Sequence, residues 1–195
     1  MTKHSHFSIV FSIAVLTILS SCTTVQPAVV QKLDELTAVT ITYCRTPLIM
    51  SPDTPYIREA RRDYVQLGAI EVNRMGALEY YLWLGITEVD QVAAIDNHPE
   101  GFASIVLAGD EKSIELDVKG WSPSVIGASA PVYQKLFPDS ADAYYQVTLD
   151  QIQLLADINS LSLRTTGSAT KEFVSWYSQE TFESDLAEFL SEVME

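Results

Sequence analysis

Two stretches of alternating residues, joined by a short reversal, constrain the fold of this chain most. Residues 64–72 and 77–89 are both rich in aliphatic and aromatic side chains, and the letters NRMG between them supply Asn and Gly for a tight turn. Alternation with a period of two is typical of strands that bury one face. The sequence therefore predicts a β-hairpin at the centre of the fold.

The second arm of this hairpin, ALEYYLWLGITEV, carries aromatic side chains on a face of its own. Its alternation places Leu78, Tyr80, Leu82 and Leu84 on one face and Glu79, Tyr81, Trp83 and Gly85 on the other. The leucine-rich face predicts core packing. Tyr81 and Trp83 on the opposite face permit three interpretations, namely packing inside the protein, stacking of a ligand, and contact with a partner protein. They are the candidate ligand or partner surface.

The rest of the body predicts a mixture of strands and helices. Strands are expected over 37–45 and in a second hairpin, 102–108 with 113–119, whereas 150–158 has helical spacing. A last helix is expected from a cap at Thr170, because apolar residues recur at three and four positions through to Val193. We therefore expect an α+β fold, with an antiparallel sheet built from β-hairpins and a packed C-terminal amphipathic helix.

The N-terminus holds a short apolar run, Phe7 to Leu19, preceded by Lys3 and by no acidic residue. This run has 13 residues, whereas a helix needs about 20 to cross a bilayer. A positive head, a short apolar core and then small residues are typical of a signal peptide.

The end of that run is more specific. Leu19-Ser20-Ser21-Cys22 resembles the lipobox of bacterial lipoproteins, which has an aliphatic residue, two small residues and a cysteine. The resemblance implies that Cys22 receives a diacylglycerol thioether, that residues 1–21 are removed and that the new amine is acylated. Thr23 after the cysteine implies the outer membrane, with the protein facing the periplasm. An uncleaved anchor and an ordinary secretory signal are the alternatives.

This interpretation divides the chain into three parts. Residues 1–21 are the signal peptide, 22–32 are a small and polar tether, and 33–195 are a single globular domain. From Cys22 onward the net charge is 11 − 26 = −15. Such a negative surface repels nucleic acids and anionic lipid headgroups, so neither is an expected partner.

The body contains one cysteine and one histidine that deserve a chemical interpretation. Cys44 lies in the alternating run TAVTITYCR, which favours a buried thiol in a strand over a catalytic nucleophile. His98 lies in DNHPEG with three oxygen-bearing neighbours, but the spacing matches no established zinc or calcium pattern. Arg58, Arg61 and Arg62 form a basic spot that favours solvated or paired side chains over an anion site.

No decisive catalytic signature is present in the sequence, which contains no GxSxG, no Walker loop and no GxGxxG after a strand. We expect no cofactor and no metal. The leading hypothesis is a non-enzymatic binding or envelope-assembly domain, anchored through a lipid on Cys22, for an envelope protein or a small apolar ligand. The alternatives are an envelope hydrolase acting on cell-wall or glycan material through His98 or a carboxylate pair, and a purely structural subunit.

Overall fold

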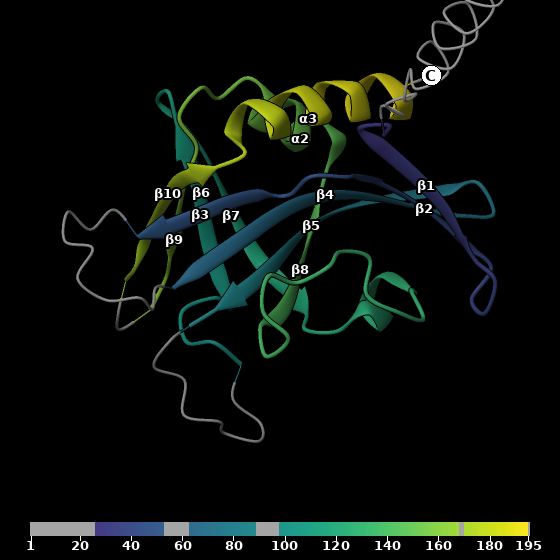
Figure 1. Ribbon diagram of the computed structural model, residues 1–195, viewed down its shortest axis with the longest axis horizontal. Helices are drawn as coiled ribbons and strands as arrows, with labels where there is room; N and C mark the ends of the chain where they lie inside the picture. The colour runs from purple at the N-terminus through teal and green to yellow at the C-terminus, as the bar shows by residue number, and fades with distance from the viewer. Residues whose placement is uncertain (1–25, 53–62, 89–97, 168–169, 195) are drawn as a thin grey trace, which may run out of the picture.

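The computed structural model describes residues 26–52, 63–88, 98–167 and 170–194 (Figure 1). The strands in these ranges are β1 (Val29–Asp34), β2 (Val39–Cys44), β3 (Leu48–Pro52), β4 (Tyr64–Arg74), β5 (Ala77–Thr87), β6 (Ser104–Gly109), β7 (Lys112–Gly120), β8 (Ala141–Val147), β9 (Ser162–Thr165) and β10 (Glu172–Tyr177). The helices are the 3₁₀ turn η1 (Pro123–Ile126), α2 (Leu149–Ala156) and α3 (Gln179–Val193).

The strands close into an eight-stranded antiparallel barrel. The order around the ring is β4-β3-β10-β9-β6-β7-β8-β5, and β5 pairs again with β4. The hairpin β1–β2 lies outside the ring, on the part of β4 that β3 leaves free: β2 pairs with Thr40↔Asn73 to Tyr43↔Ile70, and β3 with Leu48↔Leu67 to Met50↔Val65. The expected antiparallel sheet is confirmed, and its closure into a ring is an additional finding.

Both predicted hairpins are confirmed. β4 and β5 pair as far as Arg74↔Ala77, which leaves Met75 and Gly76 as a two-residue turn with φ of 52° and 94°. β6 and β7 are joined in the same way through Asp110 and Glu111, with φ of 49° and 64°. Two consecutive residues with positive φ match the right-handed twist of the flanking strands, which is why such turns join hairpins.

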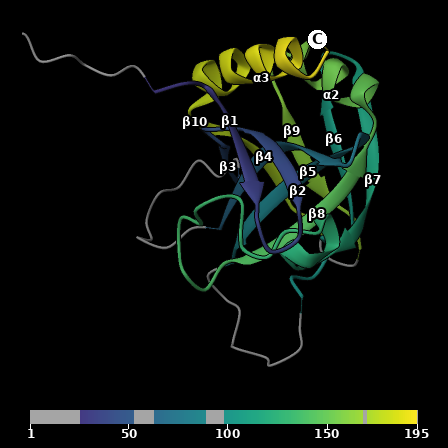
Figure 2. The same ribbon diagram turned by 90° about the vertical axis from the view of Figure 1, so that its right-hand side faces the viewer.

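The two α-helices cover one end of the barrel (Figures 1 and 2). Its interior is filled by side chains. This core includes Leu67, Leu84, Tyr145 and Phe173 from the strands and Phe102 from the turn before β6, all at 0% exposure. The apolar side of α3 joins it through Phe182, Leu186, Phe189 and Leu190, and α2 through Ile152 and Leu155. The expected C-terminal amphipathic helix packed on the sheet is therefore present.

A second core lies on the outer surface of the barrel. It is formed by outward-facing side chains of β2, β4, β5 and β8 together with Ile126, Ala128 and Tyr133. The last three belong to residues 121–140, which connect β7 to β8 and include η1. We call this segment the covering loop. Its residues 131–137 form irregular backbone.

The expected start of the last helix at Thr170 is also wrong. Residues Glu172–Tyr177 form β10 between β3 and β9, and α3 begins only at Gln179. Phe173, Trp176 and Tyr177 fit a spacing of three and four, but the segment EFVSWY is dominated by β-branched and aromatic residues, which favour a pleated surface. Pairing with β3 on one side and with β9 on the other makes this segment a strand and not part of the helix.

The tether is shorter than the sequence predicts, because β1 begins at Val29 and pairs with β2 from Val29↔Cys44 onward. Gln31 and Lys32 interrupt the apolar pattern of VVQKLD, so the pattern did not indicate a strand. Gln31, Lys32 and Leu33 are exposed. The arginine spot at 58–62 and the lipobox lie outside the described residues.

Candidate contact surface

The two side chains named by the sequence as a candidate surface lie in the second core. Tyr81 is 2% exposed and Trp83 is 1% exposed. The Trp83 ring stacks on Tyr133 of the covering loop at 4.7 Å and 20°, and its Nε1 donates to Oδ1 of Asp142 at 2.9 Å. In this arrangement a ligand or partner reaches them only if the covering loop leaves, so the surface they were expected to offer stays a prediction.

Tyr133 fastens the covering loop to the barrel. Its hydroxyl donates to the backbone oxygen of Ala69 at 2.8 Å, and its ring also meets Tyr43 edge-on at 5.2 Å. Burial raises the pKa of Tyr133 well above its usual value, so the phenol stays protonated as a donor. The Tyr133 ring packs directly against the β4 backbone at Gly68, where an added Cβ would collide with it.

A different group of aromatic side chains is exposed. It consists of Tyr64 at the start of β4, Phe137 in the covering loop, and Trp176 and Tyr177 at the end of β10, and we call it the aromatic face. Phe137, Trp176 and Tyr177 are 44%, 55% and 67% exposed. Tyr64 joins the group, with ring centroids 6.2 Å from Phe137 and 5.3 Å from Trp176.

An irregularity in β10 explains why two consecutive aromatic residues are both exposed. Side chains alternate between the faces of a regular strand, so one member of a consecutive pair is normally buried. Here the register against β3 shifts between Ser175, opposite Met50, and Tyr177, opposite Ile49, and Trp176 is the extra residue. Such a bulge redirects side chains locally. Phe173, before the bulge, still points into the barrel core.

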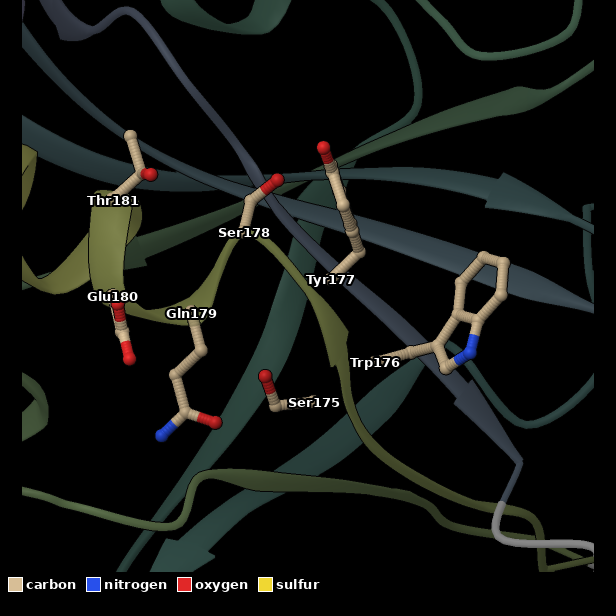
Figure 3. Close-up of a pocket in the computed structure, with 7 residues that line it drawn as sticks. All are labelled: Ser175, Trp176, Tyr177, Ser178, Gln179, Glu180 and Thr181. Carbon is tan, nitrogen blue, oxygen red and sulfur yellow. The ribbon is translucent and has the colours of Figure 1, made fainter.

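Two adjoining depressions border the aromatic face. One, of about 400 Å³, is lined by residues 175–181, where β10 passes into α3. Figure 3 shows Tyr177 and Ser178 on one side of this segment and Gln179 on the other, with the Trp176 ring directed away from Gln179. The second, of about 330 Å³, shares Ser178 and continues past Ile49 and Leu136 to Arg45. We call the second one the groove.

The cations that line the groove are bound by groups of the protein itself. Arg45 donates from Nε to the backbone oxygen of Pro27 at 2.6 Å and from Nη1 to Oε1 of Gln26 at 3.0 Å. Lys135 donates to the backbone oxygen of Ser140 at 2.6 Å and lies 3.4 Å from Oδ2 of Asp142. Arg45 therefore holds the beginning of the described chain at one end of the groove.

Cys44 has the properties of a structural thiol. It lies in β2 with 0% exposure, as the alternation predicts, and its Sγ lies 3.7 Å from the backbone oxygen of Asp185 in α3. Burial, with a further contribution from the negative charge of Asp185, raises the pKa of Cys44 to about 12. A thiol with such a pKa contains almost no nucleophilic thiolate at neutral pH.

The structure places His98 against an aromatic ring. The imidazole stacks on Trp121 with centroids 4.4 Å apart and an interplanar angle of 3°. Its sequence neighbours Asp96 and Asn97 lie outside the described residues. Within the part of the chain that is described, no group of three or more His, Cys, Asp or Glu side chains could hold a metal ion.

The aromatic face was not found from the sequence, because its members come from three separate segments and two of them were expected in a helix. One signal was available. In SWYS two large aromatic residues stand side by side between serines, and a strand that is covered on one face only leaves one of them exposed. Tyr64 and Phe137 carry no comparable signal, since their proximity arises only from barrel closure and from the path of the covering loop.

Comparisons of the chain with protein-family models, with curated proteins and with solved structures each found no match. Among the described residues, no helix has the length and apolar character needed to cross a bilayer.

Proposed function

We propose that this chain is a non-enzymatic binding domain of the bacterial envelope, anchored to the outer membrane through a lipid on Cys22 and exposed to the periplasm. Its contact surface is the aromatic face. The observation that carries the proposal is the exposure of Phe137, Trp176 and Tyr177 in one group with Tyr64. Single exposed apolar residues are common on soluble proteins, whereas a contiguous aromatic group is characteristic of interaction sites.

The composition of the face supports contact rather than catalysis. Tyr and Trp offer a large apolar area with few rotatable bonds and a polar atom at the edge, so ordering them on contact costs little entropy. The bordering depressions add Ser175, Ser178, Gln134 and Gln179, whose side chains or backbone supply hydrogen-bonding groups. Such a mixed rim around an aromatic centre is common in protein interfaces.

Lipid attachment is tested by replacing Cys22 with Ser. The resemblance of LSSC to a lipobox predicts that the wild-type chain incorporates labelled fatty acid and fractionates with membranes, and that Cys22→Ser does neither. Membrane association without label in the wild type would contradict this part of the proposal.

Contact through the aromatic face is tested in cells with a photoreactive phenylalanine analogue. We expect the analogue to form a cross-linked adduct when it replaces Tyr177 and to form none when it replaces Met75. Met75 is a matched control because it is fully exposed, at 101%, and lies in the turn between β4 and β5. Absence of an adduct at position 177, or equal adducts at both positions, would refute the aromatic face as a contact surface.

A further inference from the structure

We infer that the aromatic face rests on the interfacial zone of the same bilayer that holds Cys22, and that this bilayer surface is zwitterionic rather than anionic. The inference deepens the proposed function and rests on it, because it requires both the lipid on Cys22 and the aromatic face as a contact surface. It names the occupant of that face as lipid.

The first step is the place where the chain leaves the domain. Gln26 and Pro27 are held by Arg45, and Arg45 lines the groove. The same groove includes Leu136, which precedes Phe137 of the aromatic face, and Ser178, which follows Tyr177. The backbone amide of Arg45 also donates to the oxygen of Ala28 at 2.7 Å. The start of the described chain and the aromatic face therefore border one groove.

The second step is the length of chain between the lipid and this point. Gln26 lies four positions after Cys22, and four fully extended steps of the backbone span at most about 14 Å. A domain of this size has a radius of gyration of about 15 Å. A connection shorter than the domain is wide cannot let the domain turn its opposite side to the membrane. The groove and the aromatic face beside it consequently stay toward the lipid surface.

The third step is the chemistry of the surface that faces the bilayer. Trp and Tyr are enriched at membrane–water interfaces because an apolar ring and a polar edge suit that zone. Trp176 and Tyr177 have this character, and the apolar side chains of Phe137 and Leu136 beside them are 44% and 43% exposed. The aromatic face itself contains no Lys or Arg, the residues that anchor proteins to anionic headgroups.

The fourth step is charge. From Cys22 onward the chain carries 11 − 26 = −15, and Glu180 lines the depression next to Trp176 and Tyr177. Lys171 is bound by Asp63, the residue before Tyr64, at 2.9 Å and by Glu88 at 2.6 Å. An anionic lipid surface would repel this molecule. Zwitterionic headgroups carry no net charge, so they are the surface that the aromatic face fits best.

The experiment uses the full lipidated chain reconstituted into phosphatidylcholine vesicles with ordinary or brominated acyl chains. Bromine quenches tryptophan fluorescence only at short range. We expect brominated vesicles to quench part of the wild-type emission. Trp121→Phe should lose the same amount of emission to bromine as wild type, and Trp176→Phe should lose none. Trp121→Phe is the matched control, because both variants keep a ring and both keep the buried Trp83.

Each result decides the inference. Unquenched wild-type emission, or a Trp176→Phe variant quenched as strongly as wild type, would overturn the lipid contact. Stronger quenching after phosphatidylglycerol replaces part of the phosphatidylcholine would overturn the zwitterionic assignment. If the vesicles give no quenching while position 177 still forms a protein adduct in cells, the proposed contact function stands and its lipid occupant is refuted.

Discussion

The barrel carries two groups of aromatic side chains on its outer surface, and they have different fates. Tyr81, Trp83 and Tyr144 lie under the covering loop with exposures of 2%, 1% and 0%. Trp176 and Tyr177 of the aromatic face are more than half exposed. The residue types are the same in both groups. The difference shows that residue type does not decide whether an aromatic strand face serves as core or as contact surface; the path of one connecting segment does.

Polar side chains of β1 and β4 tie the covering loop to the sheet at two points. Asp34 accepts from the backbone amide of Ser129 at 2.6 Å and from its hydroxyl at 2.9 Å. Gln66 accepts from the backbone amide of Leu136 at 2.6 Å. Beyond Leu136 the loop turns back toward β8, and Phe137 becomes part of the aromatic face. The boundary between the two groups therefore falls at Leu136.

The largest expected effect follows from removing the central ring of the covered group. Trp83→Ala deletes the ring that stacks on Tyr133 and leaves a cavity between the barrel and the loop. We expect the free energy of unfolding to fall by about 3–5 kcal/mol, measured by chemical denaturation. A loss below about 1 kcal/mol, the range of surface changes, would show that the loop does not form a real second core.

A smaller loss is expected from crowding the same contact. In Gly68→Ala the new methyl group collides with the Tyr133 ring, which its hydrogen bond to Ala69 holds in place. Overpacking of this kind costs about 1–3 kcal/mol. A double-mutant cycle provides the control, because the cost of Gly68→Ala should largely vanish in a Tyr133→Ala background. An unchanged cost there would place the strain elsewhere.

Acid is expected to loosen the covering loop through Asp34. Hydrogen bonds from Ser129 hold the pKa of Asp34 below its ordinary value of 3.8. A depressed pKa in the folded state means that this carboxylate stabilises the fold above pH 3.8, and that the contribution is lost as the pH falls through the folded-state pKa. Asp34→Asn should lower the unfolding midpoint at neutral pH. The difference in midpoint between the variant and wild type should become smaller as the pH falls through the folded-state pKa. Parallel pH profiles for the two proteins would contradict this assignment.

The smallest effect on stability is expected on the aromatic face. Tyr177→Ser removes a side chain that is 67% exposed, so the free energy of unfolding should change by no more than about 0.5 kcal/mol. The same substitution should reduce bromine quenching of Trp176 in vesicles, because it removes a neighbouring anchor. A stability loss comparable to that of Trp83→Ala would mean that the two groups do not differ in role.

Local features of this fold were predictable, and long-range ones were not. The two hairpins follow from alternation and from turn residues a few positions apart, as in NRMG and GDEK. Barrel closure depends on pairings such as β3 with β10 and β9 with β6, which join segments that are distant in sequence. No residue in LIMSP or SLRT specifies its partner, so the ring could not be derived from pattern alone.

The candidate site shows the same limit. The alternation of β5 correctly separates Leu82 and Leu84 from Tyr81 and Trp83, but it carries no information about what covers the second pair. The cover comes from the covering loop, whose Pro, Ser and Gly residues give no periodic signal. Trp176 and Tyr177 were assigned to a helix because a bulged strand can imitate helical spacing over six residues. Their exposure follows from a register shift that only the paired strands define.

Radical footprinting of the lipidated chain on membranes, compared with soluble Cys22→Ser, tests the central difference most directly. The account predicts that oxidation of Trp176 and Tyr177 falls on the membrane, that exposed Met75 is oxidised equally in both forms, and that Trp83 is protected in both. Equal oxidation of Trp176 and Tyr177 with and without the membrane would contradict the account.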